Sequence, residues 1–188
     1  MIKFNRIKSV AVFMGSSFGD DTIYEQQTIE MSRLVAQHQL RMVYGGGKEG
    51  LMGVAAHSVM AAGGEVIGIS PITLSAEAID PAEITQFIEV DSIDERKQMM
   101  IAAADAFIVL PGGFGTLEEL AQVISWAKID LHSKPLALLN TKGFYDSLWR
   151  WLIDCVNCGF VQQSELEYLH IFDHPLDIFT YFKSFDDV

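Results

Sequence analysis

"VLPGGFGTLEEL", residues 109–120, joins a short apolar run to a segment with the pattern of a helix. The turn between them carries Pro111, Gly112, Gly113 and Gly115. An ordinary strand-to-helix turn needs only one or two residues with special backbone angles. These residues leave a stretch of main chain that no side chain shields. We therefore expect a ligand to approach this backbone closely.

Outward from this turn, apolar segments of strand length alternate along the chain with segments that show helical periodicity. The expected strands cover residues 9–17, 41–47, 65–71, 84–90, 106–113, 134–140 and 168–172. The expected helices cover residues 20–38, 51–62, 92–104, 116–132 and 145–159, with a short helix from Pro175. The strands lack strict alternation of apolar and polar residues, which is typical of a parallel sheet covered on both faces. We expect one α/β domain over residues 1–188, doubly wound and Rossmann-like, with a mostly parallel sheet.

Three turns rich in small residues follow expected strands, and parallel topology places all of them at one edge of the sheet. They are residues 15–20 (GSSFGD), 44–50 (YGGGKEG) and 111–116 (PGGFGT). The helix expected from Ser92 begins at the same edge. Because open parallel sheets bind ligands outside the carboxyl ends of their strands, we expect the functional site here. The candidate contacts in the first two turns are Gly15, Ser16, Gly45 and Gly46.

The composition indicates an acidic globular protein. Of the 188 residues, 49% are hydrophobic, and 25 acidic against 13 basic side chains give a net charge of -12. Basic residues form no cluster, so we expect binding neither to nucleic acid nor to an anionic membrane surface. No apolar run is long enough to span a membrane, and we interpret the N-terminal segment as a first strand rather than a signal peptide. An anionic ligand must then be attracted locally, by main-chain N–H groups, a helix end or single cations.

Cys155 and Cys158 have the spacing of a redox or zinc motif, but their position argues against both. A redox pair opens a helix after a strand, whereas these residues lie late in a helical pattern, and zinc requires further ligands. We expect two reduced thiols in a cytoplasmic protein. The five histidines are scattered and the acidic residues lack coordinating spacing, so neither a metal nor another cofactor is expected.

The turn at 111–116 matches neither common nucleotide fingerprint. A dinucleotide motif needs glycine where Glu118 stands, and a Walker motif needs serine or threonine where Glu49 stands. The remaining interpretation is a phosphate nest, in which N–H groups of Gly112–Thr116 face an anion at the positive end of a helix dipole. Such a nest holds one phosphate, which suggests a mononucleotide or a sugar phosphate. A tight turn with close helix–sheet packing is the alternative. For Gly45–Gly47 packing and ligand binding explain the glycines equally well, whereas for Gly112–Gly115 the helix start that follows favours the nest.

Glu119 has two interpretations that the turn alone leaves open. Thr116 and Glu119 fit a capping box, in which Glu119 only reaches back to the main chain of Thr116. Alternatively, Glu119 is a catalytic acid beside the nest. Arg96 opens the preceding helix at the same sheet edge, where it can clamp a polar ligand instead of remaining a solvated surface residue. The joint presence of Arg96 and Glu119 favours catalysis.

These residues together resemble the LONELY GUY (LOG) family, whose members hydrolyse cytokinin riboside 5'-monophosphates. PGGFGTLEE (111–119) matches the family motif PGGxGTxEE, and YGGGKEGLMG (44–53) matches YGGGxxGLMG. The resemblance covers most of residues 10–160. It implies an N-glycosyl hydrolase with a nucleoside 5'-monophosphate as substrate, assembled as a homodimer with its sites near the subunit interface.

The resemblance also implies roles for individual residues. Arg96 and Glu119 are the catalytic pair. The expected phosphate contacts are Gly112, Gly113, Gly115 and Thr116. The expected contacts with the rest of the nucleotide are Lys97, Glu118, Glu77 and Ser125. Asp94 stands where the family often has histidine, in MHxRK, which leaves the base preference open.

The implied reaction is hydrolysis of the bond between an adenine base, plain or N6-modified, and ribose 5-phosphate. One alternative is a general AMP or purine nucleotide nucleosidase. Another is a nonenzymatic nucleotide or molybdopterin carrier, which needs the nest but neither Arg96 nor Glu119. The label lysine decarboxylase, often attached to relatives, fits poorly. Such enzymes hold pyridoxal phosphate on a lysine with an acidic partner, and no recognisable version of that arrangement occurs in this sequence.

Overall fold

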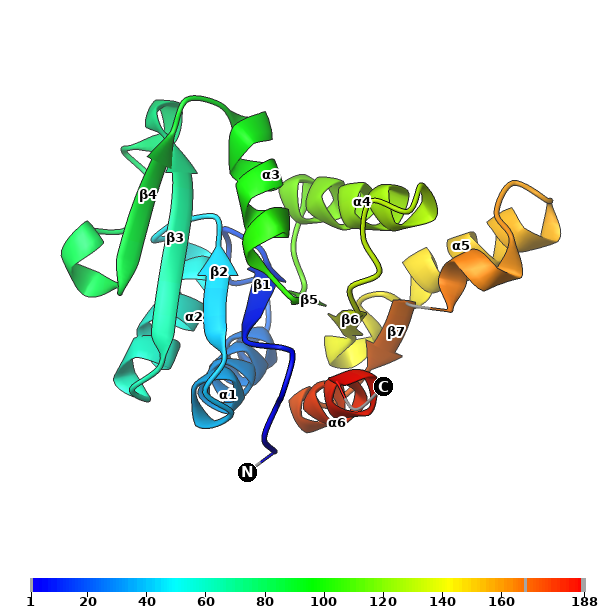
Figure 1. Ribbon diagram of the computed structural model, residues 1–188, viewed down its shortest axis with the longest axis horizontal. Coiled ribbons are helices and arrows are strands. Elements are labelled where there is room, and N and C mark those ends of the chain that lie inside the picture. The colour runs from blue at the N-terminus through cyan, green and yellow to red at the C-terminus, as the bar shows by residue number, and fades with distance from the viewer. Residues whose placement is uncertain (1, 168, 187–188) are drawn as a thin grey trace.

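The computed structural model describes residues 2–167 and 169–186 and contains a seven-stranded sheet (Figure 1). The strands are β1 (Ser9–Phe13), β2 (Arg41–Tyr44), β3 (Glu65–Pro71), β4 (Gln86–Val90), β5 (Ala106–Val109), β6 (Leu136–Leu139) and β7 (Leu169–Phe172). Their order in space is β4-β3-β2-β1-β5-β6-β7, and each neighbouring pair is parallel. The expected α/β fold is confirmed. Tyr168, which the sequence placed in the last strand, lies outside the described residues.

Helices cover both faces of the sheet. They are α1 (Thr22–Gln37), α2 (Gly50–Ala61), α3 (Ile93–Ala103), α4 (Phe114–Lys128), α5 (Asp146–Asn157) and α6 (Pro175–Asp186). The apolar core has two parts, one containing side chains of α1, α2 and α6 and the other containing side chains of α3, α4 and α5. Within the described ranges, none of these helices combines the length and the apolar character that a membrane span requires.

The central strand β1 explains why the strands lack a polar face. Val10 and Val12 pack in the core beneath α1 and α2, whereas Ala11 and Phe13 pack in the core beneath α3 and α4. Successive side chains of a strand point to opposite faces of the sheet. Because helices cover both faces here, every position of β1 is buried.

The loops that follow β1 and β5 diverge from each other at the middle of the sheet. β1 pairs with β2 on one side and with β5 on the other. The chain first winds outward from β1 to β4, then returns and winds outward in the other direction from β5 to β7. This reversal is a topological switch point, where open α/β sheets bind ligands. The N–H of Gly15 donates to the carbonyl of Pro111 at 3.1 Å and joins the two loops.

The connection between β3 and β4 forms a further wall at this edge. It contains two short 3-10 helices, η1 (Ile72–Leu74) and η2 (Pro81–Glu83). Hydrogen bonds tie it to the loop after β2: Lys48 N–H donates to the carbonyl of Glu77 at 3.0 Å, and Ile79 N–H donates to that of Gly46 at 2.8 Å. The β3–β4 connection therefore stands beside the ends of β1 and β2.

The start of α4 differs from the expectation. The helix begins at Phe114, and Gly113 occupies the N-cap without any side-chain hydrogen bond. Thr116 is thus the third helical residue, and Glu119 lies in the second turn. The capping-box interpretation of Thr116 and Glu119 is wrong. It requires Thr116 to be the N-cap residue, whereas Gly113 is the N-cap of α4.

Candidate functional site

A cavity of about 370 Å³ lies at the carboxyl edge of the sheet, bounded by the loops after β1, β2 and β5 and by α3 and α4. The residues that the sequence singled out and that line this cavity are Gly15, Ser16, Gly45, Glu77, Arg96, Gly113, Gly115, Thr116 and Glu119. They come from segments far apart in the chain. The expected meeting of three small-residue turns at one edge is therefore observed.

Arg96 and Glu119 form an ion pair that joins α3 to α4 at this cavity. Arg96 Nη2 donates to Glu119 Oε1 at 2.8 Å, and the side chains are only 16% and 9% exposed. The guanidinium also packs against Gly45, where an added Cβ would lie 3.2 Å from its central carbon. Gly45 is thus a packing glycine, but the group that it accommodates is the arginine of the site.

The protonation of Glu119 reflects two opposing effects. Burial raises the pKa of Glu119 above its ordinary value, while the charge of Arg96 and its hydrogen bond lower this pKa. A raised pKa brings a carboxyl group closer to the range in which a general acid or base exchanges a proton. Arg96 keeps the carboxylate form accessible and holds it in one orientation.

Arg96 has one buried donor that the described residues leave without a partner. Its Nε atom is buried and has no hydrogen-bond partner among the described residues. A buried donor left without a partner costs about 1–3 kcal/mol, so such groups are normally completed by water or by a ligand. The planar guanidinium can hold Glu119 through one edge and a polar ligand through another.

The N-terminus of α4 faces the same cavity. Because no side chain caps this helix, the N–H groups of Phe114, Gly115 and Thr116 lack partners within it. A Cβ added to Gly113 or to Gly115 would meet nothing within 4 Å, so packing does not require glycine at either position. Their small size leaves the main chain open, and the helix dipole makes the opening favourable for an anion.

Gly112 is a glycine for a different reason. An added Cβ would collide with the side chain of Thr116 and lie 2.8 Å from the main-chain nitrogen of Gly15. Thr116 itself is buried. Gly112 therefore lets the loop after β5 pack against the loop after β1, and it lies outside the lining of the main cavity. The packing alternative holds for Gly112 and not for Gly113 or Gly115.

Comparisons with known proteins show the family to which the chain belongs. The family described as "Possible lysine decarboxylase" matches residues 52–182. The chain is 41% identical over 160 residues to the cytokinin riboside 5'-monophosphate phosphoribohydrolase LOG2 of Arabidopsis thaliana, which covers 85% of this chain and 75% of that protein. The chain belongs to the LOG family. It is likewise 41% identical to the probable cytokinin riboside 5'-monophosphate phosphoribohydrolase LOGL9 of Oryza sativa subsp. japonica, over 85% of this chain and 70% of that protein.

The fold of this LOG family member also occurs in more distant proteins. The molybdenum cofactor binding protein from Rippkaea orientalis superposes with a TM-score of 0.73 at 23% identity. The match covers 96% of this chain and 98% of that one. At this identity the likeness supports the fold alone.

Two residues to which the LOG resemblance assigned nucleotide contacts lie beside the cavity rather than in its lining. Lys97 Nζ lies 2.7 Å from Glu118 Oε1 and 3.2 Å from Asp94 Oδ1. The Lys97 side chain is 9% exposed, whereas that of Asp94 is 83% exposed. Asp94, at the position of the family histidine, therefore contacts Lys97 and does not line the cavity.

Ser125 and Gly46 are also absent from the lining. Ser125 is exposed on α4, beyond Glu119. Gly46 has a positive φ of 72°, and an added Cβ would lie 3.0 Å from the Cβ of Ser70. Gly46 therefore shapes the loop after β2 and supports the site indirectly.

The structure adds apolar residues that sequence reasoning did not select. Met52 and Leu74 line the cavity, and so does Phe114, whose side chain is 93% exposed. Met52 and Phe114 stand inside the two quoted LOG motifs, which could have drawn attention to them. No comparable signal marks Leu74, because it belongs to the irregular β3–β4 connection.

The part of the chain that the structure describes offers no ready-made metal centre, since no three His, Cys, Asp or Glu side chains gather there. Cys155, in α5, and Cys158, at its end, are free thiols.

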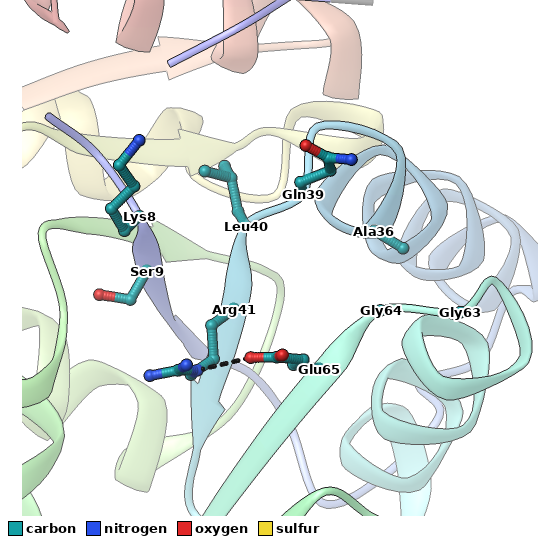
Figure 2. Close-up of a pocket in the computed structure, with 9 residues that line it drawn as sticks. All are labelled: Lys8, Ser9, Ala36, Gln39, Leu40, Arg41, Gly63, Gly64 and Glu65. Atoms are coloured by element: carbon teal, nitrogen blue, oxygen red, sulfur yellow. Dashed lines mark hydrogen bonds and ion pairs between the residues drawn. The ribbon is translucent and has the colours of Figure 1, made fainter. Parts of the chain in front are cut away.

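A second cavity, of about 400 Å³, lies at the opposite, amino edge of the sheet (Figure 2). Lys8, Arg41 and Glu65 line it, and Arg41 Nε donates to Glu65 Oε2 at 2.9 Å. Gln39 and Gly63, which follow the C-terminal ends of α1 and α2, complete its wall. Helix C-termini present carbonyl groups and the negative end of the dipole, so this edge lacks the anion site of the other.

Proposed function

We propose that this chain hydrolyses the N-glycosidic bond of adenine riboside 5'-monophosphates, including N6-modified ones, to free base and ribose 5-phosphate. On this proposal it is an N-glycosyl hydrolase that activates cytokinins. The observation that carries the proposal is the buried Arg96–Glu119 ion pair beside the uncapped N-terminus of α4 in one cavity. The phosphoribohydrolase names of relatives at 41% identity support it.

The N-terminus of α4 binds the 5'-phosphate. The N–H groups of Gly113, Phe114, Gly115 and Thr116 supply donors, and the helix dipole supplies favourable potential. The phosphate is remote from the bond that breaks. Its binding energy therefore serves to position the ribose against the catalytic pair.

Arg96 and Glu119 perform the chemistry. Water adds to C1' of the ribose while the bond from C1' to the base nitrogen breaks. The base leaves with the electron pair and takes up a proton from solvent, and the proton that water loses returns to solvent through Glu119. The transition state carries positive charge on the sugar, as in glycoside hydrolysis. Glu119 stabilises this charge and accepts the proton of the attacking water. Arg96 orients Glu119 and keeps it ionisable close to a phosphate, which by itself would raise the pKa of Glu119.

The base lies against the wall formed by the β3–β4 connection and the start of α2. Met52 and Leu74 provide apolar contacts for a flat ring, and Glu77 provides an acceptor for an exocyclic amine or a ribose hydroxyl. The space at this wall decides whether a prenyl group on N6 is accepted, because pocket shape sets such discrimination.

The decisive experiment measures free base released from AMP and from N6-isopentenyl-AMP by wild-type protein, with adenosine as the control without phosphate. We expect both monophosphates to react, with kcat/KM at least about 100-fold above that of adenosine because phosphate binding positions the ribose. A comparable kcat/KM for adenosine would contradict the phosphate role of α4.

The same assay separates the rival functions. Equal kcat/KM for AMP and N6-isopentenyl-AMP would identify a general AMP nucleosidase. Tight nucleotide binding without any release of base would identify a carrier. A carrier would not need the buried Arg96–Glu119 ion pair, and for that reason we favour the hydrolase.

We also propose that the protein is a homodimer. Trp151 on α5 is 59% exposed, and Phe160, shortly after α5, is 79% exposed. Phe114 and Leu117 add exposed apolar surface at the start of α4, on the same side of the sheet. Large exposed apolar side chains in such number favour a subunit interface. Light scattering of the wild type and of Trp151→Glu tests this, and a monomeric wild type would contradict it.

We further infer that the protein works in the cytoplasm. Cys155 and Cys158 are free thiols close together in the sequence, which suits a reducing compartment. Fluorescent tagging of the full chain in its own cells would test this location.

A further inference from the structure

Two ion pairs join α3 to α4 through consecutive residues. Arg96 pairs with Glu119 at 2.8 Å, and Lys97 pairs with Glu118 at 2.7 Å. Only the first pair lines the cavity. Lys97 is almost fully buried, and a second acceptor, Asp94, lies 3.2 Å from its ammonium group. The ammonium is thus held by two carboxylates and does not line the space where the nucleotide would bind.

The charged groups around Glu119 come from three elements. Arg96 and Lys97 face it from α3, Glu118 precedes it on α4, and Glu77 shares the cavity with it from the β3–β4 connection. The positive charge of Lys97 lowers the pKa of Glu119, and the negative charge of Glu118 raises it. The hydrogen bond to Glu118 raises the pKa of Lys97, so Lys97 stays protonated.

We propose that Lys97 and Glu118 are positioning residues, which clamp α3 to α4 and balance the charge at Glu119 without contacting the substrate. This inference rests on the proposed hydrolase function. It replaces the substrate contacts that the LOG resemblance implied for both residues. Either member alone would bias Glu119, since an unpaired cation stabilises the carboxylate and an unpaired anion stabilises the protonated acid. With both charges present, their opposite effects on the pKa of Glu119 offset each other, so Arg96 is the charged group that mainly sets this pKa.

The test is the pH profile of kcat/KM for AMP, whose acid limb reports the ionisation of Glu119 in the free enzyme. Lys97→Met removes a positive charge, so we expect the limb to move up by about half to one pH unit. Glu118→Gln removes a negative charge and should move the limb down by about as much. The double variant should return close to the wild-type limb, because the two effects oppose each other.

Controls separate this role from a structural one. Lys97→Arg keeps the charge and should keep the wild-type limb. Arg41→Met and Glu65→Gln remove the partners of a similar ion pair at the amino edge and should leave the limb unmoved. Thermal unfolding checks each variant, and Glu118→Gln carries the test alone if Lys97→Met does not fold, because the Glu118 side chain is 58% exposed.

The inference is supported if the acid limb moves in opposite directions in Lys97→Met and Glu118→Gln while KM for AMP stays within about twofold of the wild-type value. An unchanged KM shows that neither residue contributes to ground-state binding of the substrate. Shifts in the same direction, or a raised KM with an unmoved limb, would overturn it and return Lys97 and Glu118 to substrate binding. A wild type that releases no base from AMP would overturn the proposed function together with this inference. If the wild type is active but the acid limb moves in neither Lys97→Met nor Glu118→Gln, the inference is overturned and the proposed function stands.

Discussion

Two cavities of similar size lie at opposite edges of one sheet, and each contains an Arg–Glu ion pair. The carboxyl-edge cavity of about 370 Å³ contains Arg96 and Glu119 at 2.8 Å. The amino-edge cavity of about 400 Å³ contains Arg41 and Glu65 at 2.9 Å. Volume and pair distance therefore do not distinguish a candidate active site from an ordinary surface hollow.

Burial and helix polarity do distinguish them. The side chains of Arg96 and Glu119 are 16% and 9% exposed, whereas those of Arg41 and Glu65 are 50% and 56% exposed. Solvent screens the second pair, so it contributes little. The carboxyl edge also receives the N-terminus of α4, while the ends of α1 and α2 bring carbonyl groups to the amino edge. An anion is favoured at only one of the two cavities.

Removing the charge of each glutamate gives the largest contrast between the cavities. Glu119→Gln should retain its fold and still bind AMP, yet release base at least about 100-fold more slowly, because an amide cannot stabilise a developing cation. Glu65→Gln should turn over like the wild type. Normal base release by Glu119→Gln would erase the functional difference between the cavities and favour the carrier.

Exchanging each arginine for lysine sharpens the same comparison. Lysine keeps the charge but loses the planar guanidinium, which holds Glu119 and carries further N–H donors. We expect Arg96→Lys to reduce kcat/KM for AMP by about tenfold or more. Arg41→Lys should have no effect on this constant. A fully active Arg96→Lys would show that charge alone suffices at the carboxyl edge.

A glycine substitution should separate stability from function at the N-terminus of α4. Gly115 lies in the first turn with open space around its missing Cβ, so Gly115→Ala should raise the unfolding free energy by up to about 1 kcal/mol. Gly115 lines the cavity, so an added methyl group would take space from the phosphate, and we expect KM for AMP to rise several-fold. Calorimetry and steady-state kinetics measure the two effects, and an unchanged KM would remove Gly115 from the phosphate site.

Asp186 should affect stability and leave catalysis unchanged. Its carboxylate accepts N–H groups of Asn5, Arg6 and Ile7 at 2.6–2.8 Å, close to the amino edge. Burial alone raises the pKa of Asp186, but these bonds and Lys183 lower it to about 2.

Because the folded-state pKa of Asp186 lies below the ordinary value, its stabilisation is present at neutral pH and is lost as pH falls toward 2. Asp186→Asn should therefore lower Tm at pH 7 by about 3 °C or more, with a smaller difference in acid and unchanged base release. An equal loss of Tm at pH 7 and pH 2 would contradict the electrostatic origin.

Most of the fold could be predicted because its signals are local. Apolar runs without alternation indicated buried parallel strands, and helical periodicity located the helices between them. The start of α4 was misplaced because Thr116 and Glu119 imitate a capping box, a pattern in which side chains decide the boundary. In the structure Gly113 takes the cap, and the backbone freedom of a glycine leaves no side-chain signal to detect.

The candidate site could be predicted in part, again because some of its signals are local in the sequence. Gly113, Gly115 and Arg96 were found because each lies at the end of a strand or the start of a helix that topology brings to one edge. The LOG resemblance assigned Lys97 and Glu118 to the substrate, and both adjoin the candidate catalytic pair Arg96 and Glu119 in sequence. On a helix, adjacent residues point about 100° apart, so a neighbour in sequence need not share the cavity.

The sequence by itself determined the α/β class, the edge of the sheet at which the candidate site lies and the two motifs of the LOG family. These depend on periodicity and on residue types at turns, which act over a few positions. Only the tertiary structure decided that Glu119 pairs with Arg96, that Lys97 turns to Glu118, and that one of two similar Arg–Glu pairs is shielded from water. Burial and the direction of each helix end arise from packing between distant segments, and these set the electrostatics on which the chemistry depends.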